Sequence, residues 1–184
     1  MTTVTTLYDV LPESLYNQLR NIALLVCDVD GVFSDGRIYL GNQGEELKAF
    51  HTRDGYGVKA LVNSGIDVAV ITGRRSQIVA ERMQALKVKH IIQGEENKAD
   101  ALAALLNTLQ LTPAQVAAVG DDMPDTGMYA HSAVNIAVKD AHPAVLQQAN
   151  WITTQRGGFG AVREICDTLL QANDALDGIQ GSSV

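Results

Sequence analysis

Short runs that are apolar throughout alternate along this chain with longer segments in which apolar residues recur every three or four positions. The first pattern predicts strands buried on both faces, and the second predicts the helices that cover them. Six strands are expected, at residues 22–27, 67–71, 88–92, 116–119, 134–138 and 151–153. Strands separated by single helices indicate an α/β domain with a doubly wound parallel sheet.

The segments between these strands give the helices. Helical spacing is clear at 78–86 and 99–109, and Pro143 suits the first turn of a helix that follows Asp140. A further amphipathic segment around 11–19 predicts a peripheral helix near the start of the chain. The Gly- and Ser-containing stretch from 174 to 184 is expected to be a tail that is mobile or docks onto a partner.

One stretch interrupts the alternation directly after the first strand. Residues 37–40 and 45–50 have the pattern of two short strands around a Gly-Asn-Gln-Gly loop, which predicts a β-hairpin. The segment Arg53-Asp54-Gly55 is interpreted as the close of this hairpin. A hairpin at about 35–55 would lie over the carboxyl ends of the strands as a flap. Because no other insertion is long enough to form a cap domain, residues 1–184 are expected to be one Rossmann-like domain.

The first strand ends in the most informative motif of the chain. Asp28 and Asp30, followed by Gly31, stand at its carboxyl end. Residues i and i+2 of a strand share a face, so both carboxylates would point into the space where open α/β sheets bind ligands. Two like charges so close favour a divalent cation, which prefers carboxylate oxygens. An ordinary turn formed by Asp and Gly is the alternative interpretation of this segment alone.

Polar residues also follow other strands. The hydroxyl of Thr72 and the free N–H groups of the next turn are suited to phosphate oxygens, although a helix cap explains them equally well. Lys98 stands at the start of a predicted helix, where the helix dipole disfavours a cation, so its position indicates that it faces an anion. The alternative is a lysine on the surface in contact with solvent. Asp121, Asp122 and Asp125 crowd another strand end, and helix capping explains only one of them.

The charge balance narrows the range of partners. The chain has 14 basic and 21 acidic residues, a formal net charge of −7 and an aromatic content of 5%. No nucleic acid or membrane partner is therefore expected, because binding to either needs a basic patch on the protein. An anionic substrate would have to be bound by local cations or by a metal, against the negative net charge. Cys27 and Cys166 lie far apart in apolar contexts and predict no disulfide. With no apolar leader or membrane span in the sequence, a cytoplasmic protein is expected.

Taken in chain order, Asp-x-Asp, Thr, Lys and the late acidic group resemble the motifs of the haloacid dehalogenase superfamily of phosphotransferases. The resemblance implies that Asp28 is the nucleophile that accepts the phosphoryl group. Asp30 would protonate the leaving oxygen and then activate water. Thr72 and Lys98 would hold the transferring group. The resemblance also implies Mg²⁺ as the cofactor.

The metal ligands implied by the same resemblance are Asp28, the backbone carbonyl of Asp30, and Asp121. Asp122 and Asp125 would orient the groups around the ion. The residues by themselves leave open which of the three late acids contacts the metal.

A narrower resemblance covers residues 20–172. It is carried by the segments DVDGVFSDGRIYLGNQGEELKAFHTRDGYGVKAL, ITGR, NKADAL, GDDMPD and TTQRGGFGAVREICD. These are similar to the family of phosphatases that act on 3-deoxy-D-manno-octulosonate 8-phosphate in lipopolysaccharide biosynthesis. Members lack a cap domain and form homotetramers, in which the flaps assemble into a barrel and a neighbouring subunit helps to close each site. The resemblance therefore implies a sugar acid phosphate as substrate.

This family also implies a set of substrate-binding positions. They are Asp30, His51, Thr52, Arg53, Asp54, Gly55, Lys59, Arg74, Arg82 and Lys98. Lys59 stands where relatives often carry Arg, and His51 where Asn is common. A nine-carbon N-acylneuraminate phosphate is therefore kept as the alternative substrate. Gly157 and Gly158 either admit the tail of a neighbouring subunit or form a turn before the last helix.

Two other classes of protein share parts of this pattern. Receiver-like signalling domains also join acids, a Thr and a Lys on a doubly wound sheet. Their phosphoacceptor Asp follows the third strand, where this chain has Gln93 and Gly94. A non-catalytic paralogue would keep the fold and the oligomer, yet would have no physical need for the full set of catalytic side chains. The pattern favours an enzyme over both.

Overall fold

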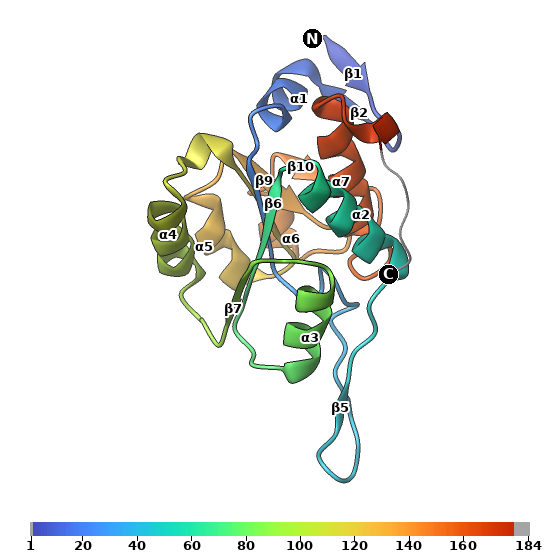
Figure 1. The fold of residues 1–184 in the computed structure, drawn as a ribbon, viewed down its shortest axis with the longest axis vertical. Helices are drawn as coiled ribbons and strands as arrows, with labels where there is room; N and C mark the ends of the chain where they lie inside the picture. The colour runs from blue at the N-terminus through green and yellow to red at the C-terminus, as the bar shows by residue number, and fades with distance from the viewer. Residues whose placement is uncertain (1, 179–184) are drawn as a thin grey trace.

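A six-stranded parallel sheet forms the centre of the molecule (Figure 1). The computed structural model describes residues 2–178, and the sheet has the strand order β10-β9-β8-β3-β6-β7. Its strands are β3 (Leu24–Cys27), β6 (Asp67–Thr72), β7 (His90–Gln93), β8 (Val116–Gly120), β9 (Val134–Ala137) and β10 (Trp151–Ile152). All six expected strands are confirmed, with ends that shift by at most two residues, and so is the doubly wound α/β class.

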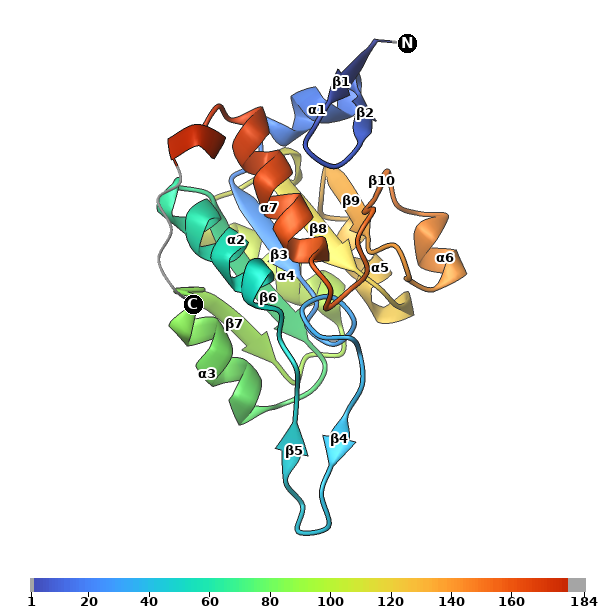
Figure 2. The ribbon, with the colours of Figure 1, turned by 90° about the vertical axis from the view of Figure 1, so that its right-hand side faces the viewer.

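Helices cover both faces of this sheet. α2 (Thr52–Asn63) and α7 (Ala161–Ala172) lie on one face, whereas α4 (Lys98–Leu109) and α5 (Thr126–Tyr129) lie on the other (Figures 1 and 2). The described chain also contains α1 (Glu13–Leu19), α3 (Gln77–Ala85), α6 (Pro143–Leu146) and 3₁₀ turns at Pro113–Gln115, Met123–Asp125 and Leu176–Gly178. The helices predicted from the sequence pattern are all present.

Glycine lets α2 and α7 approach each other closely. A Cβ on Gly57 would lie 2.9 Å from Cδ of Arg163 and 3.1 Å from Cβ of Cys166, so a larger residue would push the two helices apart. Cys166 and Cys27, which ends β3, are both buried free thiols. The tight packing of α2 and α7 fixes the layer that lies against β3.

The hairpin after β3 is confirmed as well. β4 (Tyr39–Leu40) pairs antiparallel with β5 (Glu46–Leu47). We refer to residues 37–50 as the flap. Figure 2 shows the flap extending beyond the carboxyl ends of the parallel strands, away from the body of the molecule.

The expected close of the hairpin at 53–55 is corrected by the structure, because α2 already begins at Thr52. His51 caps this helix, and its Nδ1 accepts a hydrogen bond from the backbone N–H of Arg53 at 3.1 Å. Histidine is not among the usual N-cap residues, which is why no helix start was expected there. The flap is therefore shorter than the sequence pattern suggested, and its exit leads directly into a helix.

The N-terminal segment forms a hairpin that was not predicted. β1 (Thr3–Thr5) pairs antiparallel with β2 (Val10–Pro12), so the helix expected at 11–19 begins only at Glu13. Strands of three residues are too short to show a clear alternation of polar and apolar positions. Tyr8, in the turn, donates a hydrogen bond to Asp167 of α7 at 2.7 Å. This bond holds the hairpin against the last helix.

The predicted tail, residues 174–184, follows α7. Residues 176–178 form a 3₁₀ turn, and the rest of the predicted tail, 179–184, lies outside the described residues. No helix among residues 2–178 combines the length and the apolar character that crossing a membrane requires.

The strand order places a switch point between β3 and β8. From β3 the chain moves outward to β6 and β7, and then crosses back to β8 on the other side of β3. In open α/β sheets such a point opens a crevice beyond the carboxyl ends of the two strands. Asp28 follows β3 and Asp121 follows β8, and the N–H of Asp28 donates a hydrogen bond to the carbonyl of Val119 at 3.0 Å. The two acids therefore face the same crevice.

Candidate active site

The polar residues that follow β3, β6 and β8 meet around one cavity of about 560 Å³. Its lining consists of Asp28, Asp30, Gly36, Thr72, Gly73, Arg74, Glu95, Glu96, Lys98, Asp121, Asp122, Pro124 and Asp125. All four predicted catalytic residues and the predicted metal ligands thus contribute to the same cavity. The prediction from strand-end positions is consistent with this arrangement, because parallel strands deliver their carboxyl ends to one edge of the sheet.

Lys98 links the acid after β3 to one of the acids after β8. Its ammonium group donates hydrogen bonds to Asp28 and to Oδ1 of Asp125, the latter at 2.6 Å, and all three side chains are buried. Burial by itself would lower the pKa of Lys98, but the two carboxylates outweigh it and hold this pKa above its ordinary value. Lys98 is therefore a permanent cation that faces the cavity, not a solvated surface lysine.

The carboxylates outnumber this cation. Asp28, Asp121 and Asp125 each offer an oxygen within 4.8 Å of the others. Burial, followed by repulsion from Asp125, raises the pKa of Asp28 to about 7. Burial, followed by repulsion from Asp28, raises the pKa of Asp121 to about 8. A divalent cation would relieve this repulsion, so the donor set fits a hard metal ion with oxygen ligands.

The three late acids have different surroundings. Oδ2 of Asp125 accepts hydrogen bonds from the backbone N–H groups of Asp121 and Asp122, at 2.8 and 3.1 Å, and its Oδ1 is bound by Lys98. Asp122 is exposed and accepts from the N–H of Met123 at 2.8 Å. The carboxylate of Asp121 occupies the space that a Cβ on Gly31 would fill. Of the three, Asp121 has the carboxylate best placed to contact an ion in the cavity.

Thr72, Asp30 and Arg74 lie around the same cavity. Thr72 ends β6 and is 3% exposed, with its side chain in the cavity lining. Arg74 follows two residues later and is about half exposed, and its Nε lies 3.9 Å from Oδ2 of Asp30. A hydroxyl, an ammonium and a guanidinium therefore line the same cavity as the acids. Such a space can bind a phosphate group and neutralise its charge.

Two flap residues that sequence reasoning missed also reach this region. Lys48 forms an ion pair with Asp30, and Glu46 forms one with Arg74 at 3.1 Å. A signal for them was present in the sequence, because Glu46 and Lys48 are two positions apart on a predicted strand and therefore share a face. Glu95 and Glu96, which follow β7 and line the cavity, were missed as well.

Several predicted substrate-binding residues do not line the cavity of the described chain. His51, Thr52 and Arg53 lie where the flap joins α2, and Arg53 lines a separate pocket of about 200 Å³ beside Tyr8 and Arg163. The others are on or beside α2 and α3, namely Asp54, Gly55, Lys59 and Arg82. The guanidinium of Arg82 lies over Gly55, where a Cβ would collide with it. Within one subunit the structure thus separates these positions from Asp28.

Asp54 is the most buried of this second group, at 1% exposed. Its Oδ1 accepts a hydrogen bond from the backbone N–H of Arg163 at 2.9 Å, in the first turn of α7. Its Oδ2 is buried without a hydrogen-bond partner. Burial raises the pKa of Asp54 to about 6, against the opposing effect of the backbone N–H groups of Arg163 and Gly160. Asp54 therefore caps α7 from the neighbouring helix.

Replacing Asp54 with Asn tests this capping role through the pH dependence of stability. The pKa of Asp54 is raised in the folded protein, so ionising it disfavours folding, and stability is lost as pH rises from about 4 to about 6. The Asn variant lacks this loss. Between pH 4 and pH 7 the free energy of unfolding of the wild type should therefore fall by about 2 kcal/mol relative to that of the Asn variant. Urea denaturation of both proteins at the two pH values measures the difference.

The variant Asp67→Asn, at a half-buried carboxylate far from α7 that pairs with Lys89, is the control and should not remove the loss of stability assigned to Asp54. An equal pH dependence in Asp54→Asn and the wild type would contradict the assignment of Asp54 as a buried helix cap.

Gly157 and Gly158 pack against the loop that carries the first acidic pair. A Cβ on Gly157 would overlap the carbonyl oxygen of Gly31, and one on Gly158 would overlap the backbone at Ser34 and Asp35. The N–H of Gly158 donates a hydrogen bond to the carbonyl of Val32 at 2.9 Å. Of the two alternatives left open by the sequence, the structure shows the turn before α7, and the close approach of the two glycines is to the loop after β3 of the same chain.

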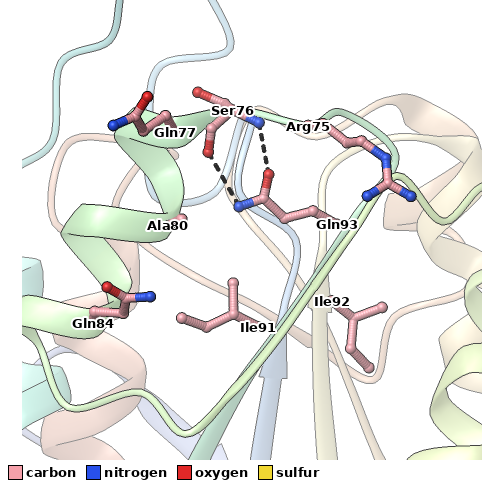
Figure 3. Close-up of a pocket in the computed structure, with 8 residues that line it drawn as sticks. All are labelled: Arg75, Ser76, Gln77, Ala80, Gln84, Ile91, Ile92 and Gln93. Carbon is pink, nitrogen blue, oxygen red and sulfur yellow. Dashed lines mark hydrogen bonds between the residues drawn. The ribbon is translucent and has the colours of Figure 1, made fainter.

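A second cavity, of about 720 Å³, lies between α3 and the edge strand β7 (Figure 3). The side chain of Gln93 accepts a hydrogen bond from the N–H of Ser76 at 2.6 Å and donates one to its carbonyl at 3.1 Å. Ile91 and Ile92 supply much of the apolar lining (Figure 3). The residues described as lining this cavity include no carboxylate, so the acidic site and this cavity are chemically different.

Comparison with known proteins agrees with the geometry of the acidic site. Residues 90–165 match the family model for haloacid dehalogenase-like hydrolases. The chain is 49% identical over 181 residues to 3-deoxy-D-manno-octulosonate 8-phosphate phosphatase KdsC of Yersinia pestis, covering 98% of this chain and 97% of that protein. It is 46% identical to KdsC of Escherichia coli K12 over 179 residues, which is 97% of this chain and 95% of that protein.

Solved structures show the same relationship. The crystal structure of the Yersinia pestis phosphatase superposes with a TM-score of 0.96, covering 100% of this chain and 99% of that one. The enzyme from Moraxella catarrhalis, solved in complex with magnesium ion, phosphate ion and KDO, is 39% identical with a TM-score of 0.88, covering 90% of this chain and 95% of that one. With its fold, its acidic cavity and these relatives, the chain belongs to the 3-deoxy-D-manno-octulosonate 8-phosphate phosphatase family of haloacid dehalogenase-like hydrolases.

Proposed function

We propose that this protein is a Mg²⁺-dependent phosphatase that hydrolyses 3-deoxy-D-manno-octulosonate 8-phosphate to the free sugar acid and phosphate through an aspartyl-phosphate. The observation that carries this proposal is the buried carboxylate of Asp28 at the switch point, in contact with Lys98 and close to Asp121. A relative that binds magnesium, phosphate and the sugar acid product supports the choice of substrate and cofactor.

The metal would be held by the carboxylates of Asp28 and Asp121 and by the backbone carbonyl of Asp30. Asp125 would keep Lys98 and the loop of Asp121 in place, since both of its oxygens are already hydrogen-bonded. When bound, Mg²⁺ supplies positive charge that lowers the repulsion between Asp28 and an anionic phosphate. The excess of acids over cations in the cavity supports this assignment.

The chain's own side chains then carry out two successive displacements. A carboxylate oxygen of Asp28 attacks phosphorus, while Asp30 gives a proton to the sugar oxygen as its bond to phosphorus breaks. The hydroxyl of Thr72 and the ammonium of Lys98 bind the phosphoryl oxygens and stabilise their charge. In the second displacement Asp30 takes a proton from water, the oxygen of that water attacks phosphorus, and the carboxylate of Asp28 is released.

We assign contacts with the sugar acid to two groups of residues. Asp30, Arg74 and Lys98 belong to the cavity of the same subunit. The remaining positions are His51, Thr52, Arg53, Asp54, Gly55, Lys59 and Arg82. We propose that these act from a neighbouring subunit of a homotetramer, either directly or, for the buried Asp54, by shaping the surface around the flap exit.

Exposed apolar side chains on the flap support the tetramer. Ile38, Tyr39, Leu40 and Leu47 are 39–73% exposed, although each is large and apolar. Apolar residues clustered on a projecting hairpin are typical of a surface that is covered in an assembly. Flaps from four subunits would bury these side chains against one another and bring the α2 residues of one subunit toward the cavity of the next.

The biological setting follows from the proposed substrate. The product sugar acid would be consumed in lipopolysaccharide biosynthesis, and we place the reaction in the cytoplasm. Two buried free thiols fit such a reducing compartment. We also propose that residues 1–184 act as a single domain without a cap and without a nucleic acid or membrane partner.

Phosphate release from 3-deoxy-D-manno-octulosonate 8-phosphate, measured with Mg²⁺ and with excess chelator, tests the function. We expect rapid release with Mg²⁺ and a fall to the background rate on chelation, because without the ion the cavity repels an anionic substrate. A nine-carbon N-acylneuraminate 9-phosphate should be a poorer substrate in the same assay.

The binding of the metal has its own readout. Mg²⁺ should raise the melting temperature of the wild type but not that of Asp121→Asn, because binding to the folded state stabilises it by mass action. Failure to release phosphate at any Mg²⁺ concentration would contradict the proposed substrate. Equal activity with chelator would contradict the metal assignment.

A further inference from the structure

Lys48 is a half-buried residue whose ammonium group the proposed reaction does not yet use. It follows β5 at the base of the flap, and its side chain is 0% exposed. Its ammonium group donates a hydrogen bond to Oδ1 of Asp30. A charged lysine removed from water needs a close anionic partner, so the contact with Asp30 is required for this arrangement.

Lys48 belongs to a closed ring of four alternating charges. Its Nζ lies 3.4 Å from Oε1 of Glu46, and Oε2 of Glu46 accepts a hydrogen bond from Nη2 of Arg74 at 3.1 Å. Nε of Arg74 lies 3.9 Å from Oδ2 of Asp30, which closes the ring. Two members come from the flap, one from the loop after β3 and one from the loop after β6. The ring therefore joins the flap to the two loops of the cavity.

The ring presents the two oxygens of Asp30 to different surroundings. Oδ1 accepts a hydrogen bond from Lys48, whose side chain is not exposed to solvent. Oδ2 lies on the side of Arg74, which is 47% exposed and lines the cavity. Binding one oxygen of a carboxyl group fixes its rotation and leaves the other oxygen for a second partner. Lys48 itself does not line the cavity, so any effect on the reaction must pass through a neighbour, either through Asp30 directly or through Glu46 to Arg74.

We propose that Lys48 is a positioning residue that holds Asp30 so that Oδ2 exchanges the proton with the leaving oxygen. This inference rests on the proposed function, in which Asp30 protonates the sugar oxygen as its bond to phosphorus breaks and later takes a proton from water. The proton is carried by Oδ2 throughout, and Lys48 keeps all of its own protons. A flap residue thereby contributes to proton transfer without touching the substrate.

The competing explanation is that Lys48 only anchors the flap. The two explanations differ in their dependence on the leaving group. An alkyl oxygen, such as that of the sugar, needs a proton in order to leave, whereas an aryl oxygen leaves readily without one. Loss of positioning therefore slows the first displacement selectively for alkyl phosphates, and kcat/KM reports that displacement without the later attack of water. Loss of an anchor slows both kinds of substrate to the same extent.

The test compares Lys48→Met with the wild type on 3-deoxy-D-manno-octulosonate 8-phosphate and on p-nitrophenyl phosphate, both with Mg²⁺. General acid–base catalysis contributes about 10²- to 10⁴-fold, so we expect kcat/KM on the sugar phosphate, which reports the first displacement only, to fall by about 10²-fold or more. On the aryl phosphate kcat/KM should fall by less than about 5-fold, because no proton has to be delivered to the leaving oxygen. Asp30→Asn should show the same selectivity. Lys89→Met, which removes an exposed ion pair with Asp67, should leave both rates unchanged.

An equal fall on both substrates, or no fall on either, would overturn the inference while leaving the phosphatase function intact. If the wild type hydrolyses neither substrate, the proposed function fails and the inference fails with it. If Lys48→Met does not fold, as judged by circular dichroism, Lys48→Arg replaces it. That variant keeps the charge of the ring but places a larger group against Oδ1, and the same ratio of alkyl to aryl rates decides the question.

Discussion

Replacing Asp28 with Asn is expected to abolish phosphate release while leaving the protein folded. The amide is nearly isosteric with the carboxylate but cannot attack phosphorus, and Lys98 keeps its second partner, Asp125. Turnover should fall by at least about 10⁴-fold, the scale observed when a nucleophile or its base is removed from other hydrolases. Steady-state phosphate release with saturating Mg²⁺ measures this effect.

The same substitution should make the metal-free protein more stable. The pKa of Asp28 is raised to about 7 by burial and by Asp125, so its ionisation disfavours the folded state. Stability is therefore lost as pH rises from about 4 to about 7, and the Asn variant avoids that loss. At pH 8, without metal, its melting temperature should exceed that of the wild type.

The control for Asp28→Asn is Asp67→Asn, which removes a half-buried carboxylate that pairs with Lys89 and should retain full activity. Turnover of Asp28→Asn within about 10-fold of the wild type would exclude Asp28 as the nucleophile. A lower melting temperature at pH 8 would contradict the view that the buried acids repel one another.

Replacing Gly157 with Ala is expected to have the largest effect on stability. Its Cβ would overlap the carbonyl oxygen of Gly31, and a backbone atom cannot rotate away as the end of a long side chain can. We expect a loss of about 3 kcal/mol or more in the free energy of unfolding, at the upper end for overpacked sites. Urea denaturation of the metal-free protein measures the loss, and kcat should also fall because Gly31 adjoins Asp30.

Gly73→Ala is the control for stability. A Cβ at Gly73 meets its nearest heavy atom, the carbonyl oxygen of Glu95, only at 4.0 Å, which is an ordinary contact. This variant should unfold within about 1 kcal/mol of the wild type. An equally mild effect in Gly157→Ala would show that the two loops do not depend on their close approach.

The sequence predicts well both the parallel sheet and the edge of the sheet at which the candidate active site lies, because both depend on short-range patterns. Uniformly apolar runs mark buried strands, and the acids that follow two of those strands must meet when the strands are parallel neighbours. Asp28, Thr72, Lys98 and Asp121 are consequently found around one cavity. The N-terminal hairpin was missed because its strands have only three residues each.

Contacts between distant segments could not be predicted in the same way. The carboxylate of Asp54 caps a helix that begins more than a hundred residues later, and no local sequence pattern predicts such a cap. The ion pair between Lys48 and Asp30 depends on how the flap folds back at its base. Sequence spacing indicated that Glu46 and Lys48 share a face, but not which acid that face would meet.

The position of Gly157 and Gly158 against the loop after β3 has a consequence for the synthesis of the protein. Asp28 leaves the ribosome more than a hundred residues before the two glycines that support its loop. A domain generally folds as a unit during synthesis. A nascent chain that has not yet reached these glycines holds its acidic pair on an unsupported loop, so the acidic cavity is completed only after residue 158 has emerged.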